Sequence, residues 1–379
     1  MKRLVLVGAG HAHAQVLKDW MAAPVAGTEL WVVSPSPLAP YSGMVPGWLA
    51  GHYRFGDICI DFAALAAAAG ARWLSDEVVG LDADRRQLAL RSGLALDYDL
   101  LSLNVGSTLT PPPVVGARVL PLRPLGRLRA AWEAALAELS AAPADRPLTV
   151  TAIGGGAAGV EALFAVRHRL LQLQPRRAVH GGLVSRSAAL LPDMAPGAER
   201  YVRRALAAAG MTVQLGCRYG PTIAAASDLL LWATGAEAAA WQHGCGLAVS
   251  AGGYLRVDSG LRSVSHANVH AVGDCAAWAD PLPKAGVYAV RMGPVLSHNL
   301  RAALGGGSPV RYQPQRRFLA LLATGDRRAI ASWGRFSAEG AWVWRWKDHI
   351  DRSFLRRFDA SLPPTQRAER PQPTPKDPA

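Results

Sequence analysis

The sequence predicts an α/β fold with two similar halves, each a parallel sheet flanked by helices, and a small C-terminal α+β region. Three stretches carry this prediction. Residues 2–13 and 148–161 each have the pattern of a strand, a glycine-rich turn and a helix. Residues 269–275, Val-His-Ala-Val-Gly-Asp-Cys, are typical of a short buried strand that ends at a Gly-Asp pair. Together they indicate one chain that holds two dinucleotides in two Rossmann-like domains.

The first glycine-rich turn has the pattern Gly-x-Gly-x-x-His and follows a strand predicted over residues 2–7. Two glycines permit a tight turn and a close approach to a pyrophosphate, and a helix over residues 14–21 would add N–H groups and a positive dipole end. His13 replaces the usual third glycine, so we expect looser packing or a displaced helix. A chance glycine turn remains the alternative. The predicted contacts are Gly8, Ala9, Gly10, His11 and Ala12.

The rest of the first half is less distinctive. A strand over residues 29–33 ends at Ser34, where an acidic residue would normally bind a ribose hydroxyl. Residues 40–47 form a turn-rich loop near the ligand or a simple surface connection. We then expect a helix over residues 61–70, a meander of strands at 71–79, 87–90 and 94–98, and a buried strand over 99–103 that leads to Gly106.

The second glycine-rich turn is a complete Gly-x-Gly-x-x-Gly, formed by Gly154, Gly156 and Gly159 after a strand over residues 148–153. This is a strong signal in its strand–turn–helix context. The next strand, 179–185, ends in Ser185-Arg186. An acidic residue there would favour NAD, while Arg186 can accommodate a 2′-phosphate, so the choice of nucleotide stays open.

The order of the elements indicates an internal duplication. A buried strand over residues 228–232 runs into Ala-Thr-Gly, as the first half runs into Asn-Val-Gly at its end. The chain then returns to the first half, and a helix that opens near residue 283 points its N–H groups at the ligand. The predicted domains are 1–115 with 245–310 for the first dinucleotide, 116–244 for the second, 311–360 as a C-terminal interface or membrane-surface region, and a disordered tail at 361–379.

Composition narrows the classes of partner. The net charge of +13 suits nucleic acid, an anionic membrane surface or anionic cofactors. Because no RNA-binding signature accompanies it, no nucleic acid partner is expected. The four cysteines form no close pair, so neither a disulfide framework nor a metal site is expected. No apolar run reaches the roughly 18 residues of a membrane span.

Residues 342–358 mix aromatic side chains with cations. Such a segment suits a basic amphipathic helix at a membrane interface, and the alternative is a helix that packs on its own domain. Because the cysteines form no close pair, a reducing cytoplasm is the expected location. The protein would be either free there or peripheral on the inner face of the cytoplasmic membrane.

Taken in order, these motifs resemble the FAD-dependent pyridine nucleotide–disulfide oxidoreductase superfamily, on the side of type II NADH dehydrogenases and sulfide:quinone reductases. The resemblance covers about residues 1–310. Four stretches, at 10–13, 40–44, 283–291 and 316–322, are more closely similar to a subfamily often fused N-terminal to selenide, water dikinase.

The resemblance implies FAD in the first domain and NADH or NADPH in the second. Gly8 and Gly10 would lie at the pyrophosphate, Ser34 near the adenosine ribose, and Gly106 on the flavin side. Gly273 and Asp274 would lie at the ribityl chain, with Lys284 and Ala285 beside the isoalloxazine. Glu161 would lie near the ring junction, or is simply a helix-start carboxylate stabilised by the dipole. Glu161 and Lys284 are the catalytic candidates.

The implied activity is electron transfer from NAD(P)H through flavin to a quinone or similar acceptor. Cysteine chemistry is not expected, because Cys59, Cys217, Cys245 and Cys275 lie outside the regions that the disulfide reductases and sulfide:quinone reductases use. Two alternatives stay open. One is a flavin reductase in selenium or sulfur metabolism with selenide, water dikinase as partner, which rests on gene fusion alone. The other is a flavin-binding redox partner without turnover.

Overall fold

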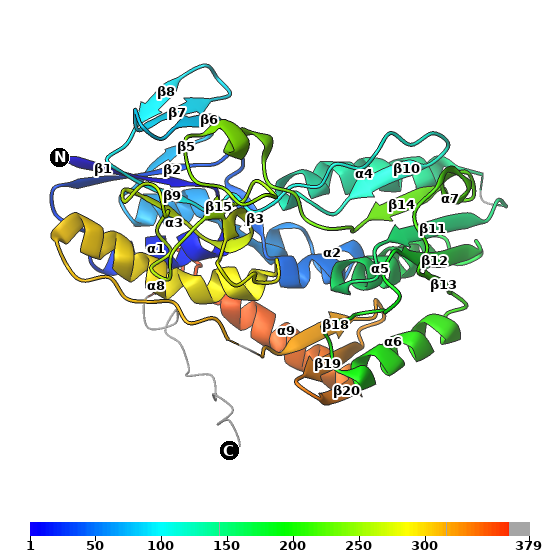
Figure 1. Cartoon of the computed structure of the whole chain (residues 1–379). Coiled ribbons are helices and arrows are strands. Elements are labelled where there is room, and N and C mark those ends of the chain that lie inside the picture. The colour runs from blue at the N-terminus through cyan, green and yellow to red at the C-terminus, as the bar shows by residue number, and fades with distance from the viewer. Residues whose placement is uncertain (144, 316, 364–379) are drawn as a thin grey trace.

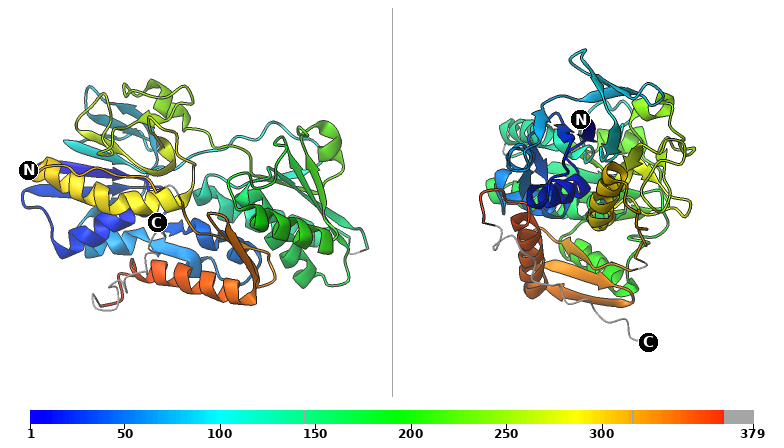
Figure 2. Two further views of the ribbon diagram at one scale, coloured as in Figure 1. Left: turned by 60° about the horizontal axis from the view of Figure 1, so that its bottom comes forward. Right: turned by 90° about the vertical axis from the view of Figure 1, so that its left-hand side faces the viewer.

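The structure is a computed structural model that describes residues 1–143, 145–315 and 317–363. Two parallel five-stranded sheets lie toward opposite ends of an elongated molecule, and the C-terminal region lies along one side of both (Figures 1 and 2). This arrangement confirms the predicted α/β class.

The first sheet has the strand order β16-β9-β1-β2-β5, all parallel, with β1 (Lys2–Val7), β2 (Thr28–Val33), β5 (Arg72–Leu74), β9 (Leu100–Leu103) and β16 (Val269–Ala271). Successive side chains of a strand point to opposite faces of the sheet, and in this sheet both sets are buried. Leu4 and Leu6 of β1 pack against helices α1 (His11–Ala22), α3 (Phe62–Ala68) and α8 (Gly286–Gly305). Val5 and Val7 pack on the other side.

That other side is covered by an antiparallel sheet of β6 (Val78–Asp82), β7 (Gln87–Leu90) and β8 (Ala95–Asp97). The single strand predicted over residues 71–79 is therefore two strands. Its first part, β5, extends the parallel sheet beside β2, and its second part opens the meander. Local pattern alone does not separate them, because both parts have strand-like composition.

The second sheet has the order β10-β14-β11-β12-β13, with β10 (Arg118–Pro121), β11 (Leu148–Ile153), β12 (Val179–Ser185), β13 (Thr212–Leu215) and β14 (Leu229–Trp232). Its helices are α4 (Leu125–Ala141), α5 (Ala157–Leu173), α6 (Pro196–Ala208) and α7 (Pro221–Ala225). In both sheets the strand before the glycine loop lies between the next strand of its half and the late strand that ends in glycine. The predicted duplication is thus a repeat of topology.

The C-terminal region is an antiparallel sheet of β18 (Ala320–Ala323), β19 (Ala329–Trp333) and β20 (Phe336–Gly340), followed by α9 (Ala341–Arg356). Helix α9 contacts the first domain through Tyr53, whose hydroxyl donates to Asp348 at 2.6 Å. The sheet contacts the second domain through the Ser332 hydroxyl, which accepts from the backbone N–H of Ala195 at 2.9 Å. The region therefore bridges both domains (Figure 2).

Short elements complete the described chain: β3 (Leu38–Pro40), β4 (Cys59–Asp61), β15 (Leu255–Arg256), β17 (Ala276–Ala277), α2 (Val45–Leu49), and 3-10 turns at Ser42–Met44, Gly56–Ile58, Ala240–Gly244 and Gly273–Cys275. Within the described ranges, no helix combines the length and the apolar character that a membrane crossing requires. Of the predicted tail, residues 364–379 lie outside the described residues.

Candidate active site between the two domains

A cavity of about 2080 Å³ runs from the first glycine loop to the second, and the C-terminal region forms part of its wall. Pockets for one drug-sized ligand are roughly 300–1,000 Å³, so this volume suits two ligands. Most of the predicted site residues line it: Gly8, Ala9, Gly10, His11, Ser34, Gly106, Gly154, Gly156, Glu161, Asp274, Lys284 and Ala285. Ala12, Gly159 and Gly273 do not line it.

Asn104 organises the first glycine loop. A Cβ atom at Gly8 would collide with its carbonyl, and one at Gly10 would collide with its side-chain amide. The amide oxygen accepts from the N–H of Ala12 at 3.2 Å, and the amide nitrogen donates to the carbonyl of Val272 at 3.0 Å. The Asn104 side chain thereby ties the loop to the segment that precedes Asp274. The only sequence signal for this role is a polar residue directly after a buried strand.

His13 is fully buried, with no exposed surface. Its Nδ1 lies 2.7 Å from the carbonyl oxygen of Gly8, and its Nε2 lies 2.9 Å from the hydroxyl of Ser102 on β9. A carbonyl only accepts, so Nδ1 carries the proton and Ser102 donates to Nε2. Burial lowers the pKa of His13 to about 4, which keeps the ring neutral.

This environment corrects the expectation of looser packing. In the second domain a Cβ at Gly159 would collide with the carbonyl of Gly154. His13 carries a Cβ at the matching position, and its buried imidazole forms hydrogen bonds to the loop and to β9. The helix itself begins at His11, earlier than the predicted residue 14, because the turn ends at Gly10.

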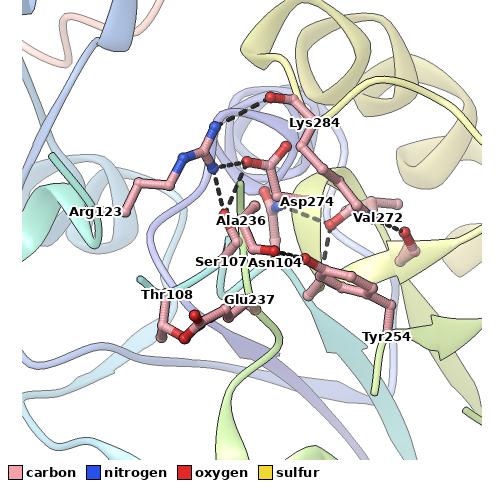
Figure 3. Close-up of polar contacts among 12 residues, drawn as sticks. Asn104, Ser107, Thr108, Arg123, Ala236, Glu237, Tyr254, Val272, Asp274 and Lys284 are labelled. Atoms are coloured by element: carbon pink, nitrogen blue, oxygen red, sulfur yellow. Dashed lines mark hydrogen bonds and ion pairs between the residues drawn. The ribbon is translucent and has the colours of Figure 1, made fainter. Parts of the chain in front are cut away.

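Asp274 lies in the 3-10 turn after β16, and Arg123 reaches its carboxylate from the segment between β10 and α4 (Figure 3). The same guanidinium contacts the hydroxyl of Ser107 and donates to the carbonyl of Lys284 at 3.1 Å. Ser107 in turn donates to Asp274 at 3.1 Å. A residue of the second domain thus completes a polar cluster of the first. An arginine in a proline-rich boundary gives no sequence signal for this role.

Lys284 lies at the cavity, but its ammonium is already engaged. It donates to the carbonyl of Ala276 at 2.6 Å and lies 3.8 Å from the centre of the Tyr254 ring. Burial lowers its pKa. Helix α8 begins at Gly286, two residues beyond Lys284, and a Cβ at Gly286 would lie 2.8 Å from the hydroxyl of Ser42. The N-terminus of α8 therefore closely adjoins the loop that precedes α2.

The second glycine loop leaves a different space. A Cβ at Gly154, whose φ is +125°, would collide with the carbonyl of Ala233, whereas a Cβ at Gly156 would meet no atom within 4 Å. Gly106 of the first domain is open in the same way. Open backbone at the mouth of a cavity lets a pyrophosphate or a ring approach closely. The two loops therefore fit dinucleotide cofactors.

Glu161 lies in the second turn of α5, where three elements meet. Its Oε1 accepts from the N–H of Ala323 in β18 at 2.8 Å. Burial raises its pKa to about 7, while the charge of Lys347 opposes the shift and that of Asp351 adds to it. Lys347 and Asp351 of α9 are both buried and pair at 2.7 Å. Glu161 is thus held in contact with the C-terminal sheet, and not only by the helix dipole.

His11 starts α1 and faces aromatic side chains. Its ring centre lies 5.3 Å from that of Tyr41 and 5.8 Å from that of Phe354 in α9. Burial lowers the pKa of His11 to about 4, although Asp274 partly offsets the shift. Ser34 is buried, and its hydroxyl donates to the carbonyl of Ser36 at 3.4 Å.

All four cysteines are free. Cys275 is buried behind Asp274, where its thiol contacts the carbonyls of Leu103 and Val272, and burial raises its pKa to about 11. Cys217 is exposed and lines the cavity on the side of the second domain. The four cysteines, all within the described residues, thus form no disulfide with one another.

Comparisons with known proteins agree with this geometry. Residues 2–293 match a family model described as "Pyridine nucleotide-disulphide oxidoreductase". No curated protein sequence matches the chain. Among solved structures, the sulfide:quinone oxidoreductase of Aquifex aeolicus has 16% identity and a TM-score of 0.74, over 94% of this chain and 91% of that one. NDH2 of Plasmodium falciparum, in complex with NADH, has 12% identity and a TM-score of 0.75, over 93% and 97%.

A third similar structure is an engineered water-forming NADPH oxidase, derived from a Lactobacillus brevis enzyme and bound to NADPH. It has 19% identity and a TM-score of 0.67, over 88% of this chain and 75% of that one. The family match spans both glycine loops and Asp274. The chain therefore belongs to the pyridine nucleotide-disulphide oxidoreductase family and is an FAD- and NAD(P)H-dependent oxidoreductase.

Proposed function

We propose that this oxidoreductase passes electrons from NAD(P)H through FAD to a quinone or a similar diffusible acceptor. One observation carries the proposal: Glu161, a carboxyl group with a pKa of about 7, borders an apolar part of the cavity wall. That wall is built by the C-terminal region and by α2, from Phe318, Leu319, Leu321, Leu322, Val45, Pro46 and Leu49. Apolar walls with a few polar groups are typical of sites for small organic ligands.

The chain's own residues have separate roles in this proposal. Bound FAD supplies the two-electron carrier between nicotinamide and acceptor. Gly8 and Gly10 let the first loop pack closely on Asn104 at the proposed FAD pyrophosphate, and Gly156 leaves open space for the pyrophosphate of the nicotinamide nucleotide. Asp274 is the proposed ligand of the ribityl chain. Ala285 caps α8, so the positive end of that helix faces the site and would favour negative charge there.

Glu161 is the proposed proton donor to the acceptor. Reduction of a quinone by two electrons consumes protons, and a carboxyl group with a pKa near neutrality can release one at working pH. The hydrogen bond from Ala323 holds this carboxyl at the boundary between the second domain and the C-terminal region. Lys284 is a positioning residue, because its ammonium is engaged with Ala276 and Tyr254 while its backbone carbonyl accepts from Arg123.

The outer face of the C-terminal region supports a membrane-dissolved acceptor. Trp342 and Trp346 of α9 are 52% and 41% exposed and stack at 6.4 Å, and Arg345 beside them is also exposed. Phe336, 66% exposed, stacks on Trp333 nearby in the chain. Aromatic rings mixed with cations favour the interface of an anionic membrane. The opposite face of α9 packs on the protein through Val343 and Trp344, and membrane binding by the exposed face is part of this proposal.

An anaerobic titration of the FAD-loaded protein tests the proposal. NADH or NADPH should bleach the flavin absorbance, and a soluble short-chain quinone should restore it. A flavin spectrum that ignores both nucleotides would overturn the proposal and favour the flavin-binding partner without turnover. Bleaching that quinones fail to reverse would exclude the proposed acceptor. Selenide, water dikinase as a partner rests on the sequence resemblance alone and stays a prediction.

A further inference from the structure

We propose that Arg186 and Arg218 form a binding site for the 2′-phosphate of NADPH, so that NADPH and not NADH is the electron donor. This inference deepens the proposed function, on which it rests, by naming the nucleotide. The two arginines are 32 residues apart in the sequence, yet both line the cavity on the side of the second domain.

Backbone pairing beyond the sheet brings the two arginines to one edge. Strands β12 and β13 are parallel neighbours, with Ser185 opposite Leu215. After the strands end, the N–H of Cys217 donates to the carbonyl of Ser185 at 3.0 Å, and the N–H of Gly216 donates to the carbonyl of Ser187 at 3.0 Å. Residues 185–187 and 216–218 therefore run side by side, and each contributes one arginine.

This edge directly adjoins the second glycine loop. A Cβ at Gly155 would lie 3.0 Å from the hydroxyl of Ser185, and the N–H of Leu191 donates to the carbonyl of Gly155 at 3.0 Å. A dinucleotide whose pyrophosphate lies at such a loop places its adenosine ribose at the end of the next strand. Here that strand is β12, so the ribose 2′ position falls beside Arg186.

The charges at this edge favour a phosphate over a hydroxyl. Both arginines are exposed, and within the described parts of the chain neither forms an ion pair. Ser185 stands where an acidic residue would bind a ribose 2′-hydroxyl, and its own hydroxyl accepts from the N–H of Ser187 at 3.2 Å. The acidic residue nearest to Arg186 along the chain is Asp193. Burial raises the pKa of Tyr288 in α8, and the charge of Asp193 adds to that shift. Guanidinium groups match the geometry of phosphate oxygens and stay charged at all working pH values.

The test compares two soluble probes, adenosine 2′,5′-bisphosphate and adenosine 5′-monophosphate, by calorimetry on the FAD-loaded protein. We expect the bisphosphate to bind at least about tenfold more tightly, since a hydrogen bond to a charged group contributes that order of discrimination. Its advantage should shrink as ionic strength rises, because the arginines are exposed. The ratio of kcat/KM for NADPH to that for NADH should favour NADPH.

The variants Arg186→Ala and Arg218→Ala should each lower that ratio, and the preference for the bisphosphate, by about tenfold or more. Charge reversal, Arg186→Glu, should invert the preference. Arg176→Ala is the matched control, since Arg176 is an exposed arginine of the same domain that does not line the cavity. Because all these side chains are exposed, the variants should retain the flavin and the unfolding temperature of the parent.

The outcomes separate this inference from the proposed function. Equal binding of the two probes by the parent protein, or a higher kcat/KM for NADH, would overturn the 2′-phosphate site while leaving the electron-transfer proposal intact. Preferential binding of the bisphosphate without flavin reduction by either nucleotide would support the 2′-phosphate site and overturn the electron-transfer proposal. A preference that survives replacement of both arginines would also contradict the assignment.

Discussion

The guanidinium of Arg123 contacts the carboxylate of Asp274 across the boundary between the two dinucleotide-binding domains (Figure 3). The two residues are 151 positions apart. Arg123 belongs to the segment that enters the second domain, and Asp274 to the segment by which the chain has returned to the first. The guanidinium of Arg123 also donates to the carbonyl of Lys284, two residues before α8. The contact therefore ties the segment that enters the second domain to cavity-lining residues of the first.

Replacing Arg123 by Met should destabilise the protein. The Asp274 side chain is only 16% exposed, so it would be left largely buried with Ser107 as its remaining donor. Loss of one partner of such a charged pair costs roughly 1–3 kcal/mol. Urea unfolding followed by flavin fluorescence would measure the change. Arg176→Met, on an exposed surface, should remain within about 0.5 kcal/mol of the parent, and an equally small effect at Arg123 would contradict the structural role.

The first glycine loop predicts a rescue experiment. Gly10→Ala would place a Cβ against the Asn104 amide, so the loop or the amide must move and the purified protein should retain little FAD. The double variant Gly10→Ala, Asn104→Ala removes the colliding atoms and should recover part of the bound flavin. Flavin content per chain, from the visible spectrum, measures both. Equal flavin loss in the single and double variants would show that the collision is not the cause.

The second glycine loop predicts the opposite behaviour. A Cβ at Gly156 meets no atom of the protein, and its backbone φ of −81° is accessible to alanine. Gly156→Ala should therefore fold normally and keep FAD, but it should raise the KM for the nicotinamide nucleotide about tenfold or more by obstructing the pyrophosphate. Steady-state kinetics and a thermal unfolding curve test this. An unchanged KM would place the pyrophosphate away from the loop.

Glu161 predicts a pH dependence of acceptor reduction. Its pKa of about 7 means that the carboxyl group can donate a proton below that value and loses this ability above it. Reoxidation of the reduced protein by a soluble quinone, followed by stopped-flow, should slow as pH rises through 7. Glu161→Gln should slow the reaction by roughly 10²–10⁴-fold and flatten the profile, whereas an unchanged profile would exclude Glu161 as the donor.

The same group predicts a stability effect with a defined sign. The folded-state pKa of about 7 lies above the unfolded value near 4.3, so the folded protein holds the proton more tightly. The contribution of Glu161 to stability is full below pH ~4 and is lost as pH rises to about 7. Glu161→Gln should therefore be more stable relative to the parent at pH 8 than at pH 5. Urea unfolding at the two pH values measures the difference, and the reverse order would contradict the raised pKa.

The exposed tryptophans of α9 predict membrane binding. The parent protein should sediment with vesicles that contain phosphatidylglycerol. Trp342→Ala together with Trp346→Ala should weaken this binding about tenfold or more, because less apolar area is buried in the membrane. Leu173→Ala, an exposed apolar residue of α5 in the second domain, is the control and should bind as the parent does. Absence of binding by the parent would exclude the membrane surface as the site of the acceptor.

Strands and glycine turns were predicted closely, because their signals are local. The bounds of β1, β11 and β12 agree with the prediction, since a run of apolar residues closed by glycine or a polar residue specifies a buried strand. The second glycine turn and the repeat of topology follow from the same signals. The division of residues 71–79 was missed, because choosing between two sheets depends on neighbours distant in the sequence.

By itself the sequence determined the fold class, the two nucleotide loops and the family, since short-range patterns of glycine and apolar residues carry them. Only the tertiary structure decided which polar groups share a site. It brought Arg123 to Asp274, and Asn104 to Gly8 and Gly10 of the first glycine loop. It also brought Glu161 to the C-terminal sheet, and the segment of Arg186 beside that of Arg218. Isolated polar residues follow no periodic pattern in the sequence. Their partners come from segments distant in the chain, and burying such groups costs free energy unless they form hydrogen bonds or ion pairs. Only the packed fold specifies which groups meet.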